Sequence, residues 1–327
     1  MQGFDVEVLR PVLRAYEEKK LRHETEAAAR TREVYAKLPR VAAIDTELKT
    51  TALSIVRASF SNKKDTRAAL QAVRNHNLKL QAERAEALVA AGYTYDYTEP
   101  RYDCAQCEDT GYVGETPCEC LKRAYCTAQV EGLSRILCVD ASTFKGFKKE
   151  WYPKTRAAGQ VLSPYEQMEQ VYNYCVNYVR TFGDASDNVF FTGASGLGKT
   201  MLAACIAREV AMTGASVVYD TAFPTFARFE DEKFGRLSAG TSTRRYFSCD
   251  LLILDDLATE QTTQFTTAVL YNLINTRGRE GKKTILISSL GMEEIAKRYS
   301  GQLASRLTGD FITLAFCGQD IRALKRR

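Results

Sequence analysis

The sequence predicts an α/β protein: a parallel sheet flanked by helices, preceded by an α-helical N-terminal region and a small zinc-binding module. Three observations lead to this fold class. A glycine-rich loop lies between an apolar strand and a helix near residue 193, and further strands alternate with helices after it. Two cysteine pairs separate this part from a glycine-poor, helix-like beginning. Strands that alternate with helices form a mostly parallel sheet that is covered on both faces.

Length and composition narrow the class of protein. The chain has 327 residues, of which 45% are hydrophobic, so it is long enough for two domains. It contains no apolar run of 18 residues, and its beginning, MQGFDVEVLRPVLR, lacks the apolar segment of a signal peptide. We therefore expect a cytoplasmic protein with no membrane partner. The net charge of +5 permits a polyanionic partner but does not require one.

The first predicted region, residues 1–98, is rich in Ala, Glu, Lys, Arg and Leu. Its apolar residues recur at helical spacing, and Pro39 and Gly92 mark breaks between helices. The stripes include Leu9, Val12, Leu13 and Tyr16, then Val41, Ile44 and Leu48, and finally Val73, Leu80 and Leu88. This region is either a self-contained helical bundle or coiled coil, or an arm that binds a partner protein, and the two interpretations are compatible.

The second predicted region, residues 99–140, contains four closely spaced cysteines followed by a linker. They are Cys104, Cys107, Cys118 and Cys120. The Gly- and Thr-rich stretch between the two pairs predicts a hairpin that brings four thiolates together, as tetrahedral Zn²⁺ requires. Four thiolates leave no open position, so the zinc would be structural. The alternatives are unligated cysteines or a redox pair.

The third predicted region, residues 141–327, contains the pattern G-x-x-x-x-G-K-T between a strand at Val189–Thr192 and a helix. Its residues are Gly193, Ala194, Ser195, Gly196, Leu197, Gly198, Lys199 and Thr200. The glycines let successive backbone N–H groups face a phosphate, and the helix N-terminus adds its positive dipole end. Lys199 would reach the β- and γ-phosphates of ATP, and the Thr200 hydroxyl would bind Mg²⁺.

A second apolar strand, Leu251–Leu254, ends in two carboxylates, Asp255 and Asp256. Beside a phosphate-binding loop, Asp255 would hold Mg²⁺, mostly through water, and Asp256 would orient or deprotonate the attacking water. The alternative is a pair of aspartates that cap the next helix. Three more strands are predicted, at Val217–Tyr219, Thr284–Ser288 and Phe311–Leu314.

These motifs resemble those of the AAA+ ATPases of the DnaC/DnaI helicase-loader type, with the IstB transposition helpers as near relatives. The similar segments are GASGLGKT, LLILDDL, KKTILISSL, LASRL and GQDIRALKRR. The segment CEDTGYVGETPCECLK also looks like the zinc-bearing part of the loaders of Firmicutes and their phages. The resemblance is closest over Phe144–Arg327 and extends to Cys104–Lys122.

The resemblance implies further site residues. Ser289 stands at the sensor-1 position, where the family usually has the longer Asn, so we expect slow hydrolysis. Arg306 would be an arginine finger acting on a neighbouring subunit's nucleotide, and Arg322 would be the sensor-2 residue acting in its own subunit. Phe144 resembles the residue that packs near the adenine. Without the family, a surface salt bridge would be the preferred interpretation of each arginine.

The segment between Asp220 and Ser248 mixes phenylalanines with the cations Lys233, Arg236, Arg244 and Arg245. Aromatic rings and cations together suit single-stranded DNA, and the loaders place a DNA-contacting helix here. An ordinary solvated helix is the alternative, since acidic residues interrupt the basic run.

The predicted function is an ATP-dependent helicase loader that binds a DnaB-type replicative helicase and single-stranded DNA, assembles into a ring or spiral, and uses ATP hydrolysis to time helicase release. Its ATPase activity would be slow and dependent on a partner or on DNA. One alternative is an IstB-like transposition helper, against which the zinc segment argues. The other is a nucleotide-gated adaptor with little hydrolysis.

Overall fold

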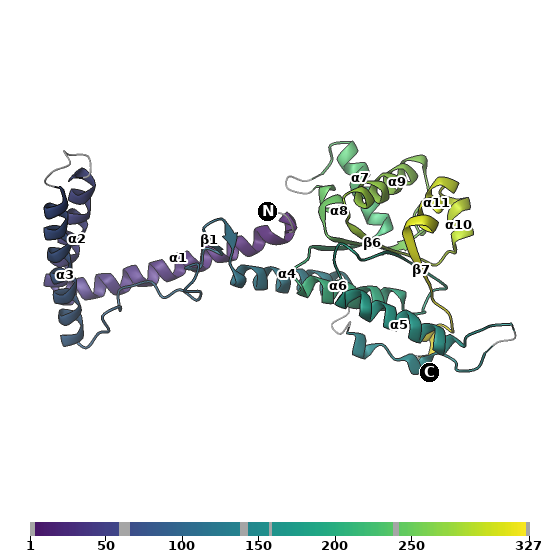
Figure 1. Ribbon diagram of the computed structural model, residues 1–327, viewed down its shortest axis with the longest axis horizontal. Coiled ribbons are helices and arrows are strands. Elements are labelled where there is room, and N and C mark those ends of the chain that lie inside the picture. Colours follow the sequence, from purple (N-terminus) through teal and green to yellow (C-terminus); the bar gives the residue numbers. More distant parts are fainter. Residues whose placement is uncertain (1–3, 59–65, 138–142, 157–158, 238–241, 325–327) are drawn as a thin grey trace. The chain divides into compact units, whose positions relative to one another are not determined.

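A computed structural model of the chain describes residues 4–58, 66–137, 143–156, 159–237 and 242–324. The chain divides into two compact units (Figure 1). One, which we call the helical unit, is Leu13–Cys118, and the other, the sheet unit, is Met1–Val12 together with Glu119–Arg327. In the part of the chain that the structure describes, no helix combines the length and the apolar character needed to cross a membrane.

The sheet unit is built on five parallel strands in the order β4-β5-β6-β3-β7. The strands are β3 (Asn188–Thr192), β4 (Val217–Thr221), β5 (Leu251–Leu257), β6 (Lys283–Ser288) and β7 (Phe311–Ala315). Each contains one of the five predicted strands, so the predicted α/β class is confirmed. β5 runs farther than predicted: it includes both aspartates, and its pairing with β6 shifts register between Leu254 and Leu257.

Helices cover both faces of this sheet (Figure 1). Neighbouring strand residues point to opposite faces: Phe191 packs with the cluster that contains α6, while Phe190 packs with the cluster that contains α9 and α11. The helices are α4 (Glu119–Leu137), α5 (Pro164–Arg180), α6 (Lys199–Met212), α7 (Ala222–Lys233), α8 (Arg244–Ser248), α9 (Gln264–Arg279), α10 (Met292–Arg298), α11 (Gly301–Asp310) and α12 (Ile321–Leu324), with 3-10 turns η1 (Phe144–Gly146) and η2 (Lys149–Trp151).

The boundaries of the two units lie after Val12 and after Cys118. The predicted domain boundaries lie after residues 98 and 140. α4 belongs to the sheet unit because buried Gln129 joins it to the start of β4: its side chain accepts from the Val217 N–H at 2.9 Å and donates to the Ala215 carbonyl at 3.1 Å. The first residues of the chain belong there too, since the Asp5 N–H donates to the Tyr125 hydroxyl at 2.7 Å.

The helical unit contains most of α1 (Val6–Lys37), then α2 (Pro39–Ala58) and α3 (Thr66–Ala90). Pro39 opens α2, where its missing N–H costs no hydrogen bond, as predicted for a break between helices. A small cluster of Val34, Val41 and Leu88 is fully buried. The predicted hairpin between the cysteine pairs is present as β1 (Tyr112–Val113) and β2 (Thr116–Pro117).

Candidate functional site

The glycine-rich loop joins β3 to α6, as the sequence predicts, and its backbone conformation requires glycine. Gly193 has φ +134°, and a Cβ there would lie 2.3 Å from the Phe316 carbonyl oxygen. Gly198 has φ +87°, and its Cβ would lie 3.0 Å from the ring of Phe147. Any other residue would be strained at both places and would collide with the loop's neighbours.

Two segments distant in sequence hold the outer side of the loop. The Ile321 N–H donates to the Gly196 carbonyl at 3.0 Å, and the buried Tyr152 hydroxyl donates to the Leu197 carbonyl at 2.8 Å. In a trans peptide the C=O and the following N–H point in opposite directions. These two bonds therefore turn the N–H groups of Leu197 and Gly198 toward the inner side, where an anion would bind.

Lys199 is buried at the start of α6, and its ammonium donates to the carbonyls of Gly193 and Ala194, the latter at 2.8 Å. Burial lowers the pKa of Lys199, and the nearby carboxylates of Asp255 and Asp256 oppose that shift. A bound phosphate would give this buried cation a stronger partner than two neutral carbonyls.

The two aspartates at the end of β5 have different surroundings. Asp255 is buried: its Oδ2 accepts from the Tyr219 hydroxyl at 2.5 Å and its Oδ1 from the Asp256 N–H at 2.7 Å. Asp256 is exposed and has φ +53°. Although the residue is exposed, neighbouring protein atoms partly remove water from its carboxyl group, and this desolvation together with the charge of Asp255 raises the pKa of Asp256. A raised pKa makes this carboxylate better able to accept a proton.

The predicted arginines occupy different places. Arg322 in α12 directly follows Ile321, whose N–H donates to the Gly196 carbonyl at 3.0 Å, so the structure brings this segment to the loop of its own chain. Arg306 in α11 is half exposed and contacts Asp310 at 3.3 Å in its own helix. Ser289 directly follows β6 and is exposed.

Phe147, rather than Phe144, lies against the loop. Phe144 packs edge-on against Tyr172 with ring centres 5.8 Å apart, whereas Phe147 stacks on Tyr152 and approaches Gly198. Sequence reasoning missed Phe147 and Tyr152, although both lie in the aromatic stretch that follows Phe144.

The four predicted cysteines come together. Their sulfur atoms all lie within 4.8 Å of one another, and the Cys104 and Cys118 sulfurs are 3.8 Å apart. A tetrahedron with Zn–S bonds of 2.3 Å has edges of about 3.8 Å, so the donor set fits Zn²⁺. The same distance is too long for a disulfide bond between these two residues.

Charged side chains support the cysteine segment. Buried Asp109 accepts from the N–H groups of Asp103 and Cys104, both at 3.0 Å. From α1, Lys19 pairs with Asp103 at 2.6 Å, and His23 lies 3.7 Å from both aspartates. The first cysteine is thus oriented by a carboxylate, a common feature around metal ligands.

Three of the four predicted DNA-contacting cations are exposed: Lys233, Arg236 and Arg244. Lys233 and Arg236 lie 5.6 and 5.0 Å from the ring centre of Phe234, which is 59% exposed. Arg245 differs from the prediction. It forms ion pairs with Asp5 and Glu7, so its charge is already neutralised and is not available to a phosphate.

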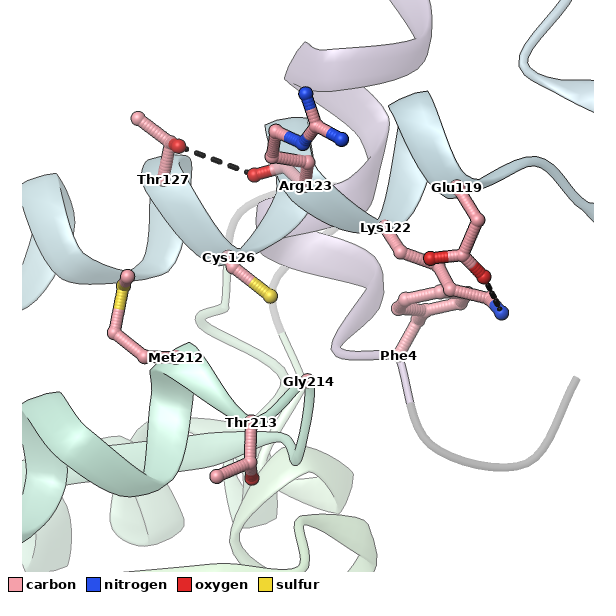
Figure 2. Close-up of a pocket in the computed structure, with 9 residues that line it drawn as sticks. All are labelled: Phe4, Glu119, Lys122, Arg123, Cys126, Thr127, Met212, Thr213 and Gly214. Atoms are coloured by element: carbon pink, nitrogen blue, oxygen red, sulfur yellow. Dashed lines mark hydrogen bonds and ion pairs between the residues drawn. The ribbon is translucent and has the colours of Figure 1, made fainter.

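A pocket of about 430 Å³ lies between α4 and the end of α6 (Figure 2). Its lining includes Phe4, Arg123 and Cys126, and the Glu119–Lys122 ion pair lies at one side. None of its nine lining residues is a predicted site residue, so the candidate phosphate site does not depend on this pocket.

Part of the chain is similar to known proteins. Residues 166–307 match the sequence family described as IstB-like ATP binding protein. The replicative helicase loader DnaC of Escherichia coli K12 is 24% identical over 134 residues, which are 40% of this chain and 54% of that protein. DnaC of Shigella flexneri matches with the same values. The chain thus spans about half the length of the curated relatives it matches.

Solved structures with a similar arrangement include a DnaC helicase loader, a DnaI, and the AMPPCP-bound DnaA of Aquifex aeolicus. Each has a TM-score of 0.43, with sequence identities of 15%, 16% and 23%. The similar parts cover 53%, 59% and 54% of this chain and 98%, 98% and 50% of the respective structures.

Proposed function

We propose that this protein is an ATP-dependent loader of a DnaB-type replicative helicase, because residues 166–307 match the IstB-like ATP binding family and the chain is similar to a replicative helicase loader. The observation that carries the proposal is the phosphate-binding loop. Its inward N–H groups lie close to Lys199 and to the two aspartates. The chain that contains this loop is similar to a replicative helicase loader.

ATP would bind with its β- and γ-phosphates at the loop amides and Lys199. Thr200 and Asp255 offer hydroxyl and carboxylate oxygens, which suit Mg²⁺. Mg²⁺, when bound, supplies positive charge to the phosphates. Asp256 would orient and deprotonate the attacking water, Arg322 would act on the γ-phosphate, and Ser289 would contact the same phosphate or the water with a shorter reach than Asn.

Arg306 would complete the site of a neighbouring copy. It is 49% exposed and its ion pair with Asp310 lies at the surface, so it can reach another chain at little energetic cost. The chain would therefore assemble into a ring or spiral, and hydrolysis would be slow until assembly, DNA or the helicase aligns Arg306.

Single-stranded DNA would bind at the end of α7. Phe234 offers an exposed ring for base stacking, while Lys233 and Arg236 beside it, and Arg244, offer charges for phosphates. The helical unit would bind the helicase, together with the cysteine segment that a structural zinc ion on Cys104, Cys107, Cys118 and Cys120 would hold in shape.

The direct test uses the full chain and the DnaB-type helicase of the same cells. We expect the two proteins to form a complex, and the wild-type chain with ATP to increase helicase loading on single-stranded DNA circles. Lys199→Ala should abolish ATP binding and helicase release while keeping the complex. Phe234→Ala should weaken binding of a single-stranded oligonucleotide about tenfold, since one stacked base contributes about 1–3 kcal/mol.

Other outcomes would identify other functions. A chain that binds no helicase but hydrolyses ATP faster with duplex DNA would be a transposition helper. A chain that binds ATP and the helicase without measurable turnover would be a nucleotide-gated adaptor. Full ATPase activity in Lys199→Ala would contradict the assignment of the loop itself.

A further inference from the structure

Tyr219 is a buried residue of β4 whose hydroxyl group lies at the polar end of the sheet. Its side chain is 3% exposed and packs in the same core cluster as α6. The hydroxyl donates to Asp255 Oδ2 at 2.5 Å. This phenol group thus holds the carboxylate that β5 offers to Mg²⁺.

The direction of this bond follows from counting hydrogens. A tyrosine hydroxyl has one hydrogen, and an ionised carboxylate can only accept. Tyr219 therefore donates to Asp255. One Asp255 oxygen accepts from Tyr219 and the other from the Asp256 N–H, and each keeps a lone pair free for a cation.

We propose that Tyr219 is a positioning residue that orients Asp255 for Mg²⁺. This inference rests on the proposed function, because it requires Mg²⁺ with a nucleotide at the loop. The carboxylate fits that ion, since it presents oxygen atoms. The Asp256 N–H holds the other Asp255 oxygen at 2.7 Å, so the carboxylate is fixed at both ends.

The test measures Mg²⁺-dependent nucleotide binding without turnover. The full chain and Tyr219→Phe are titrated with the fluorescent analogue mant-ATP, first in EDTA and then at increasing Mg²⁺. In EDTA the two affinities should agree within about twofold. The Mg²⁺ concentration for half-maximal tightening should rise about tenfold in the variant, the size expected for losing one hydrogen bond to a charged group.

The matched control is Tyr246→Phe. Tyr246 is equally buried, and its hydroxyl donates to the Asp220 carboxylate of the same strand at 2.8 Å. This variant should leave the Mg²⁺ midpoint unchanged. An unchanged midpoint in Tyr219→Phe would overturn the proposal, and so would an equal loss of affinity with and without Mg²⁺, which would show that the residue only holds the loop.

Two further measurements separate this proposal from its premise. Tyr219 replaced by 4-aminophenylalanine keeps a hydrogen-bond donor and should return the midpoint to within about threefold of wild type; no recovery would overturn the proposal. A wild-type chain that binds no mant-ATP in either condition would instead overturn the proposed function and this inference with it.

Discussion

Different kinds of interaction stabilise the sheet unit and the helical unit. In the sheet unit, both faces of five strands are covered, and buried apolar residues form extensive clusters around β3, β5 and β6. In the helical unit, a small cluster around Val34, Val41 and Leu88 is supplemented by charged pairs between helices and by three of the four converging cysteines. We infer that apolar burial dominates the stability of the first unit, and that polar contacts and the proposed zinc ion dominate that of the second.

Removal of zinc tests this difference between the units, and it should cause the largest structural change of the four predictions. In reducing buffer, a zinc-selective chelator should release the metal and unfold residues 104–118, because structural zinc sites contribute about 10–16 kcal/mol of apparent binding free energy. Hydrogen exchange of that segment is the measurement. Mant-ATP affinity, a property of the sheet unit, is the internal control and should not change. Metal analysis that finds no zinc in the reduced protein would refute the prediction.

Arg277→Met should have the next largest effect, in the sheet unit. Arg277 in α9 is fully buried and donates to carbonyls of Tyr246, Cys249 and Lys283 and to the Thr284 hydroxyl. Methionine would leave several buried carbonyls without donors, so the free energy of unfolding should fall by about 3–5 kcal/mol.

Urea unfolding followed by circular dichroism measures this loss. Arg279→Met is the matched control, since Arg279 lies two residues later in the same helix and is exposed; it should change stability by less than about 0.5 kcal/mol. If both variants lost the same amount, the buried network would have no special role.

Arg84→Met should destabilise the helical unit by about 1.5–2 kcal/mol. Arg84 in α3 donates to Asp45 of α2 at 2.7 Å, and the two side chains are only 17% and 15% exposed. Arg40→Met is the control, because Arg40 joins the same two helices through a largely exposed pair with Glu83. It should have no measurable effect in the same urea titration; equal losses in the two variants would show that burial does not matter here.

Tyr152→Phe should have the smallest effect, a loss of mant-ATP affinity of about fivefold, which corresponds to about 1 kcal/mol for one neutral hydrogen bond. Unlike the change at Tyr219, this loss should be equal in EDTA and in Mg²⁺, because Tyr152 holds the loop backbone. Tyr174→Phe, which removes an exposed bond to Asp187, is the control and should bind normally. A loss seen only with Mg²⁺ would contradict this role.

Arg245 differs most from the prediction, because its partners lie far along the chain. It stands in a basic, aromatic stretch, yet it pairs with Asp5 and Glu7 near the start of the sequence. The placement of Phe144 near the adenine stays a prediction, and the ring that lies against Gly198 of the loop is that of Phe147. The roles of Ser289, Arg306 and Arg322 stay predictions.

The sequence by itself determined what depends on local spacing. The glycines of Gly193–Thr200, the apolar strand ending in Asp255 and the two cysteine pairs each carry their geometry within a few residues, because backbone conformation and short-range chelation are local properties. Only the tertiary structure decided which distant groups orient them. Tyr219 reaches Asp255 across 36 residues and Tyr152 reaches Leu197 across 45. Such contacts depend on how strands and helices pack, and no sequence pattern in either segment identifies the residue that it contacts.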